Sequence, residues 1–435
     1  MRLKFDPQWT SMGDGEEVMR HTSALLGIEV GGHLATRVED RWSRSVTDRI
    51  HVSSWPLALW LAANWWRLRW EQRPSARPSV DWRLAHQLVS AGHGFVWPRL
   101  EFAPDGETVE IRADPAPATE KQPYGYLDSF TVSISGREFE RAVDEFIDVV
   151  IARLGSLGVE DLELPSIWNS VRAERADAAL AEVRRLEAML GFDPEEAPEG
   201  LVEKLIRLRP QVGDQAVFEL APVCGGSDAA ERLRDVLAVE QEATVRGRME
   251  LPSVAAPDPQ GAPWERGKHL ALELRKTMGR TSGPLSSDCL AELLGVSVST
   301  LREGQQDKRL PIGLAVRSGE HDFKYAFRKR LGSGRRFEAA RWIAGALVFR
   351  SNQRWLPVTD ASTAHQKIQR AFAAELLAPV ADLKQALASD FSDAAIEEVA
   401  DEFDVSPLVV SSQLANNLLI PRTRVGDAWA GVGQP

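Results

Sequence analysis

The stretch that decides the fold of the C-terminal part of this chain reads Gly334-Arg-Arg-Phe-Glu-Ala-Ala-Arg-Trp-Ile-Ala-Gly-Ala-Leu-Val-Phe-Arg350. Its apolar residues recur at helical spacing and share one face, which carries Phe337, Ala340, Ile343 (or Ala344) and Leu347. This spacing predicts a helix that is buried on one side. A second helical block, Ile368-Gln-Arg-Ala-Phe-Ala-Ala-Glu-Leu-Leu-Ala-Pro379, ends at a proline, where a helix is expected to stop.

The two blocks resemble the core of the ImmA/IrrE family of bacterial metallopeptidases. The first core helix of that family reads roughly Arg-Phe-x-x-Ala-His-Glu-x-x-His, and the second ends Phe-Ala-Ala-x-Leu-Leu-x-Pro. The chain matches the first pattern at Arg336, Phe337 and Ala340, and the second pattern over residues 372–379. The resemblance implies a mostly helical, zincin-like domain in which two His and one acidic residue bind zinc and the Glu acts as the general base.

All four chemical positions of that motif are changed in this chain. Arg341 stands at the first His, Trp342 at the general base, Gly345 at the second His and Gln366 at the third ligand. A zinc site needs imidazole, thiolate or carboxylate ligands. A guanidinium has no free lone pair, an indole offers only a donor N–H, and glycine has no side chain. We therefore predict no metal, no cofactor and no catalytic residue at this site.

The resemblance then implies a peptidase fold that is kept for binding or regulation. We expect a non-catalytic protein that binds a partner protein, because the family acts in stress responses, mobile-element control and phage defence. We also expect Arg341 to occupy the space of the lost zinc and to pair with Glu338 or Glu375. The candidate partner-binding residues are Arg335, Arg336, Arg341, Glu338 and Glu375.

The resemblance extends over residues 265–420, and the chain closes with two predicted helices over 394–417. As a helix-turn-helix, this pair would read DNA bases through Gln413, Asn416 and Asn417. However, its first helix is acidic in the region where phosphate contacts would be needed. We therefore favour a structural pair of helices.

Length and composition indicate a folded protein of two or three domains, since the chain has 435 residues, of which 43% are hydrophobic and 26% charged. Cys224 and Cys289 lie far apart in apolar surroundings, which is typical of reduced thiols, so we expect a cytoplasmic location. The longest apolar run, over residues 55–66, is interrupted and is too short to span a bilayer. No membrane partner is therefore expected.

We expect an α+β fold in four parts. Residues 1–155 would form a Trp-rich α+β domain, because nine of the 14 Trp precede residue 100 and strand-like runs are interspersed with helical ones. Residues 156–250 would form a helical connector. The Pro-, Ala- and Gly-rich stretch 251–263 reads as a linker, and residues 264–435 would form the ImmA/IrrE-like pseudopeptidase domain. The individual runs are strands over 23–30, 34–38, 49–53, 95–102, 108–112, 130–135, 314–317 and 323–327, helices over 55–70, 137–154, 167–190, 199–208, 229–242 and 265–278, and a pair of helices over 287–301.

The distribution of charge leaves a nucleic-acid function open. The net charge is −11, yet residues 264–435 carry 23 basic and 20 acidic residues, and residues 324–341 hold seven basic residues and one acidic residue. Such a cluster can contact phosphates, so a DNA-binding transcriptional regulator is one alternative. Its candidate nucleic-acid residues are Lys324, Arg328, Lys329 and Arg330.

A second alternative is an active hydrolase, a metallopeptidase or a nuclease, with a non-standard site. Asp105, Glu110 and Arg112 fall on a predicted hairpin and resemble the acidic residues beside a basic one of a metal-dependent nuclease. A metal bound by Asp105 and Glu110 would support this reading.

Overall fold

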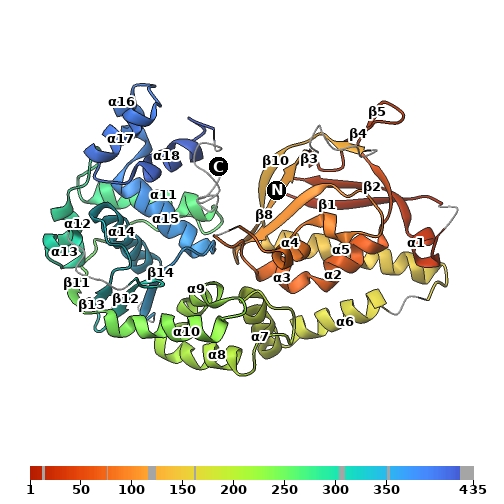
Figure 1. The fold of residues 1–435 in the computed structure, drawn as a ribbon, viewed down its shortest axis with the longest axis horizontal. Coiled ribbons are helices and arrows are strands. Elements are labelled where there is room, and N and C mark those ends of the chain that lie inside the picture. The colour runs from red at the N-terminus through yellow and green to blue at the C-terminus, as the bar shows by residue number, and fades with distance from the viewer. Residues whose placement is uncertain are drawn as a thin grey trace. The chain divides into compact units, whose positions relative to one another are not determined.

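The computed structural model describes residues 1–11, 15–75, 77–115, 124–160, 163–302, 309–349 and 353–421. The protein has the expected mixed α+β fold (Figure 1). Its contacts divide it into two compact units. Unit 1 comprises residues 1–197 without 74–76, and unit 2 comprises 198–435 with 74–76. Arg350 of the predicted core helix and residues 422–435 of the predicted last domain lie outside the described residues.

The described residues of unit 1 form three small antiparallel sheets. In the first, the order is β1-β2-β3, and β6 also pairs with β2. The second has the order β10-β8-β7 and the third β5-β4-β9. The strands are β1 (Leu3–Trp9), β2 (Ser23–Val30), β3 (His33–Leu34), β4 (Val38–Asp40), β5 (Ser45–Thr47), β6 (Ile50–Ser53), β7 (Arg99–Pro104), β8 (Thr108–Asp114), β9 (Tyr124–Tyr126) and β10 (Phe130–Ser135). The predicted hairpin of residues 95–112 is present as β7 and β8.

The Trp-rich run over residues 55–70 forms two helices instead of the expected single one. Helix α2 (Trp55–Ala63) ends at Asn64 and α3 (Trp65–Trp70) follows it. The Asn64 side chain donates a hydrogen bond to the carbonyl of Trp60 at 2.9 Å, which is the local competition with helix geometry that asparagine favours. The other helices of unit 1 are α1 (Glu17–His21), α4 (Val80–His86), the 3-10 helix η1 (Leu88–Ala91), α5 (Gly136–Ser156), α6 (Glu163–Ala176) and α7 (Ala178–Met189).

The first half of the expected connector belongs to unit 1. The predicted helix over residues 167–190 is divided at Asp177 into α6 and α7. Trp168 on α6 is fully buried in the core of unit 1, and Trp66 donates its indole N–H to Glu174 at 2.7 Å. The expected boundaries at residues 155 and 250 therefore differ from the observed division at 197, because the apolar face of α6 is buried by the Trp cluster.

Unit 2 is built around one antiparallel sheet with the order β11-β13-β12-β14. Its strands are β11 (Val245–Arg248), β12 (Gly313–Arg317), β13 (Asp322–Ala326) and β14 (Trp355–Val358). The expected strands at 314–317 and 323–327 are its two central strands, whereas both outer strands were unexpected. In Figure 1 this sheet lies between α14 (Gly332–Val348) and the helices α8 (Leu201–Val212) and α10 (Ala229–Ala238).

Four further helices of the described chain pack against α14, namely α11 (Pro263–Thr277), α12 (Ser287–Leu294), α13 (Val298–Arg302) and α15 (Ala364–Leu377). Helices α16 (Val380–Leu387), α17 (Asp393–Glu402) and α18 (Pro407–Asn416) pack against one another and belong to the same hydrophobic core. Helix α9 (Asp214–Cys224), absent from the sequence-based expectation, packs against β14, and the 3-10 helix η2 (Val239–Glu242) packs against β12 and β13. Residues 251–262 hold neither helix nor strand, as their composition predicted, although they lie within unit 2. No described helix combines the length and apolar composition that crossing a bilayer requires.

Candidate functional site

The candidate site of unit 2 centres on the guanidinium of Arg341, in the middle of α14. Only 4% of this residue is exposed. Its Nη2 donates to the carbonyl of Thr359 at 2.7 Å and to Oε1 of Gln366. Arg341 therefore links α14 to the segment between β14 and α15 and to the first turn of α15.

Gln366 is held in place by its own helix cap. Thr363 is the N-cap of α15, and its hydroxyl accepts the N–H of Gln366 at 3.1 Å. The Oε1 atom of Gln366 also accepts the N–H of Thr359 at 3.0 Å, while Nε2 donates to the carbonyl of Pro357 at 3.1 Å. The amide is thus fixed at both ends and is fully buried.

The three positions that the family resemblance assigns to metal ligands lie together. Arg341 and Gln366 are hydrogen bonded. A Cβ atom added to Gly345, one turn after Arg341, would lie 3.4 Å from Nε2 of Gln369 on α15. Trp342, at the position of the general base, packs against Phe327 with ring centroids 4.7 Å apart. A guanidinium and two amides fill the region between the two helices.

The prediction that Arg341 pairs with Glu338 or Glu375 is wrong. Glu338 is buried, and its Oε2 accepts the backbone N–H groups of Arg328 at 2.9 Å and Lys329 at 3.2 Å. Glu375 instead accepts a hydrogen bond from Gln413 at 3.1 Å. Neither carboxylate is therefore hydrogen bonded to Arg341, which is buried as expected and bonds neutral oxygens.

Two further arginines surround Arg341. Arg328 forms a bidentate pair with Asp360 at 2.7 Å for both contacts, and Arg370 donates to the carbonyl of Ala361 at 2.9 Å. Burial lowers the pKa of Arg341, and the charges of Arg370 and Arg328 lower this pKa further. The guanidinium remains cationic because its ordinary pKa is so high. The site is therefore positively charged at its centre.

The one histidine of this region is neutral. His365 is buried, and desolvation lowers its pKa to about 3, with a further contribution from Arg341. Its ring stacks on Phe349 with centroids 3.8 Å apart, and its Nε2 lies 3.0 Å from Nε2 of Gln369. Within the described ranges, no group of three or more His, Cys, Asp or Glu side chains is arranged to share a metal ion.

The outer edge of β14 is occupied as well. Pro357 lies on this outer strand and has no N–H to offer. Its carbonyl accepts hydrogen bonds from Gln366 at 3.1 Å and from Gln369 at 3.3 Å. An extended peptide that adds to a sheet edge needs free backbone donors and acceptors. At Pro357 this edge offers neither.

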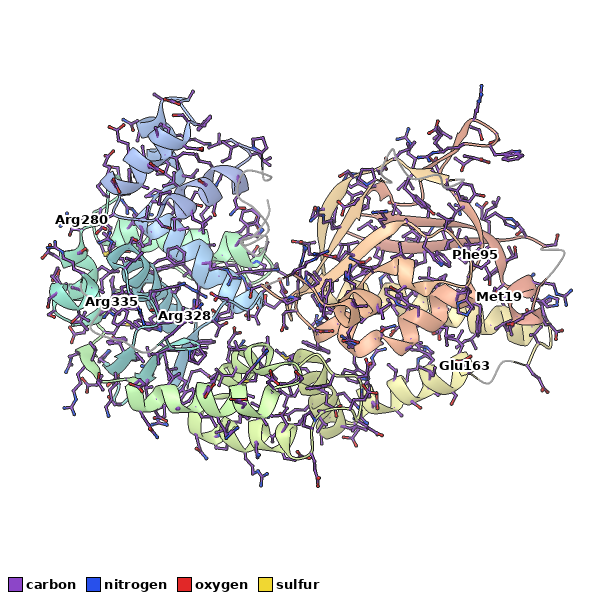
Figure 2. All side chains as sticks on the ribbon, viewed as in Figure 1. Met19, Phe95, Glu163, Arg280, Arg328 and Arg335 are labelled. Carbon is purple, nitrogen blue, oxygen red and sulfur yellow. The ribbon has the colours of Figure 1, made fainter. Side chains whose placement is uncertain are left out.

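The other expected partner-binding residues are buried and hold the fold of unit 2 together. Arg335 (Figure 2) donates to the carbonyl of Thr300 at 2.7 Å and lies over the Phe327 ring. Arg336 is 1% exposed and donates to the Ser287 hydroxyl at 2.7 Å and the Leu285 carbonyl at 2.6 Å. Both expected partner-binding residues thus lie in the interior, because α12, α13 and the turn after α17 cover this part of α14.

The expected nucleic-acid cluster is divided between surface and interior. Lys324, Lys329 and Arg330 are exposed, but Arg328 (Figure 2) is tied to Asp360. Only part of the basic run can therefore face phosphates. In the closing helix pair, Gln413 is buried and bonds Glu375 and the carbonyl of Ala378, which agrees with a structural role. A base-reading role for Gln413 does not fit this buried position.

The acidic residues of the hairpin do not form a metal site in the described chain. Asp105 is 3% exposed, and its carboxylate accepts the backbone N–H groups of Glu107 at 3.0 Å and Thr108 at 2.6 Å, together with the Thr108 hydroxyl at 2.8 Å. Such bonds are typical of an aspartate that shapes a turn. Glu110 and Arg112 follow on β8.

The sequence did not reveal several charged residues near Arg341, namely Glu219, Asp360 and Arg370. Glu219 on α9 is fully buried, and it accepts a hydrogen bond from the Thr363 hydroxyl at 2.5 Å. Burial raises the pKa of Glu219. The local signal was present, since Thr363 and Gln366 have the Thr-x-x-Gln spacing of a capping box. No comparable signal marks Asp360 or Arg370.

No protein-family model, no curated protein and no solved structure matches the chain. Its function is therefore inferred from its own residues and from the motif resemblance.

Proposed function

We propose that this protein is a non-catalytic, ImmA/IrrE-like regulatory protein that acts by binding a partner protein in a bacterial stress, mobile-element or phage-defence system. One observation carries the proposal: the Arg341 guanidinium lies buried and is hydrogen bonded to Gln366, and these residues stand at two of the three positions that the motif assigns to zinc ligands.

The chemistry of this pair opposes hydrolysis. A Zn²⁺ ion is held by lone pairs and supplies a nucleophile by acidifying bound water. The buried guanidinium offers no lone pair and would repel a second cation across a few ångströms of low-dielectric interior. The neighbouring Trp342 cannot accept a proton from water. These residues support a role in binding rather than in catalysis.

The partner would contact the outside of unit 2. The five expected binding residues are interior groups, so the surface that takes the partner is formed by other residues. A cytoplasmic location belongs to the same proposal, and it is supported by Cys224 and Cys289, which are both free thiols.

Metal analysis of the purified full-length chain tests the proposal. We expect far less than one zinc per chain after incubation with excess zinc and gel filtration. A matched triple variant, Arg341→His with Gly345→His and Gln366→Glu, rebuilds the ligand set and should bind close to one zinc per chain. A second triple variant with His and Glu at exposed positions of unit 2, at Lys324, Lys329 and Gln385, should bind none.

The outcomes separate the parts of the proposal. Stoichiometric zinc in the wild-type chain overturns the non-catalytic assignment. A rebuilt variant that keeps its helical circular dichroism but binds no zinc overturns the relationship to the zinc peptidases. If the rebuilt variant does not fold, the wild-type measurement still decides the first point. Partner binding is tested by cross-linking of the tagged chain in its host, with contacts confined to unit 1 counting against it.

A further inference from the structure

Unit 1 contains a pocket of about 480 Å³ for which neither the sequence motifs nor the proposed function has a use. It opens where η1, the loop leading into β7, and the ends of β8 and β9 meet. Its volume lies in the range of sites that enclose small molecules. The lining residues used below are Gln87, Val89, Phe95, Trp97, Glu101 and Tyr126.

The loop that forms one side of the pocket is held in a fixed conformation. Gly92, His93 and Gly94 have φ values of 61°, 56° and 79° in succession, and such a run is strained for His93. The loop is locked by two hydrogen bonds, from the Trp97 indole to the carbonyl of Gly92 at 3.0 Å and from the Tyr126 hydroxyl to the carbonyl of Val96 at 2.6 Å. The pocket therefore exists before any ligand binds.

Aromatic side chains form the apolar part of the pocket. Trp97 and Tyr126 are 3% and 5% exposed, so they lie at its base. Phe95 (Figure 2) packs edge-on against Trp97 with ring centroids 5.8 Å apart. Val89 is 42% exposed and stands at the mouth. Rigid aromatic walls of this kind favour a flat ring.

The polar part of the lining comprises Gln87, Arg99, Glu101 and Asp114, and its inner pair, Gln87 and Glu101, presents hydrogen-bond acceptors. The Gln87 amide donates to Oε2 of Glu101 at 3.0 Å, and Oε1 of Glu101 pairs with Arg73 at 3.2 Å. A β-bridge between Gln87 and Glu101 fixes their relative position. Each carboxylate oxygen can accept a second hydrogen bond, and Oε1 of Gln87 has no partner among the described residues. A ligand at this end must therefore supply N–H donors.

We propose that this pocket binds a flat heteroaromatic ring that carries adjacent N–H donors, the chemistry of a guanine base. The ring stacks against Trp97 or Phe95, and its N–H groups donate to the Glu101 carboxylate and the Gln87 amide oxygen. Adenine presents a ring acceptor beside its amino group and leaves one of these acceptors unpaired. The site belongs entirely to unit 1 and is independent of the function proposed for unit 2.

Isothermal titration of the full-length chain with guanosine and with adenosine tests the assignment. We expect saturable binding of one guanosine per chain and at least tenfold weaker binding of adenosine, because an unpaired buried acceptor is penalised. Val89→Trp should block the mouth and abolish binding. The control Leu84→Trp places the same ring at a site 56% exposed and outside the pocket lining, and should change nothing. Glu101→Gln should weaken guanosine at least tenfold.

Three results would overturn the proposal. They are no guanosine binding at millimolar concentration, adenosine binding as tight as guanosine binding, and guanosine binding that survives Val89→Trp. Near-ultraviolet circular dichroism, which reports the tryptophan-rich core of unit 1, checks that each variant is folded. If a variant is not folded, the comparison of the two nucleosides on the wild-type chain still decides.

Discussion

The Gln366 amide offers the most direct test of how the charged core is built. Gln366→Leu keeps most of the side-chain volume and removes the side-chain hydrogen bonds to Arg341, Thr359, Pro357 and Glu219. The Thr359 N–H is then buried without an acceptor, at a cost of about 1–3 kcal/mol. The guanidinium loses one of its two charge-assisted bonds, about 1.5–3 kcal/mol. The Pro357 carbonyl keeps Gln369 at 3.3 Å. We expect unit 2 to lose about 3–5 kcal/mol.

Differential scanning calorimetry measures this loss. The chain has two compact units, so the transition that moves identifies unit 2. At roughly 2–4 °C per kcal/mol for a unit of this size, its Tm should fall by roughly 6–20 °C. The matched control is Gln385→Leu on the exposed side of α16, for which we expect a change within about 0.5 kcal/mol.

A second substitution at the same position sharpens the test. Gln366→Glu keeps both acceptor bonds and places a carboxylate beside Arg341, while it loses the donations to Pro357 and to the Glu219 carboxylate. We therefore expect it to destabilise unit 2 less than Gln366→Leu. A leucine variant as stable as the wild type, or a glutamate variant less stable than the leucine variant, would refute a core organised by a buried cation and this amide.

Three further predictions concern His365, Arg336 and Asp105. Below pH 6.5 the unfolded chain protonates its His365 ring, whereas the folded ring, with its pKa lowered to about 3, does not. As the pH falls between these values, the free energy of unfolding of unit 2 should therefore decrease by up to about 1.4 kcal/mol per pH unit. Urea titrations at several pH values should show that this free energy depends less on pH in His365→Gln. Arg336→Met leaves buried carbonyls unpaired and should lower the free energy of unfolding, measured by urea titration, by about 3–5 kcal/mol. The control Lys324→Met, at an exposed position, should leave this free energy unchanged. Asp105→Ala should lower the stability of unit 1 by about 1–2 kcal/mol; a loss of metal-dependent nuclease activity with unchanged stability would contradict its turn role.

Local signals in the sequence were sufficient to predict some of the elements. The apolar period of 3.6 residues placed α14 within two residues of its observed ends, and the turn residues between β7 and β8 predicted their hairpin. The Thr-x-x-Gln spacing at Thr363 marks the start of α15. These features depend on neighbours a few residues apart, and such neighbours are visible in one sequence.

The partners of the charged core were decided by tertiary structure. The sequence alone established that the positions at Arg341, Trp342 and Gly345 cannot hold zinc, because that follows from the chemistry of each side chain. It did not show that Arg341 bonds Gln366 instead of Glu338. Glu338 accepts hydrogen bonds from the backbone N–H groups of Arg328 and Lys329, which precede α14. Gln366 lies within hydrogen-bond distance of Arg341 because α15 packs against α14. Contacts between residues distant in the chain depend on how whole helices pack, and no short-range pattern records that packing.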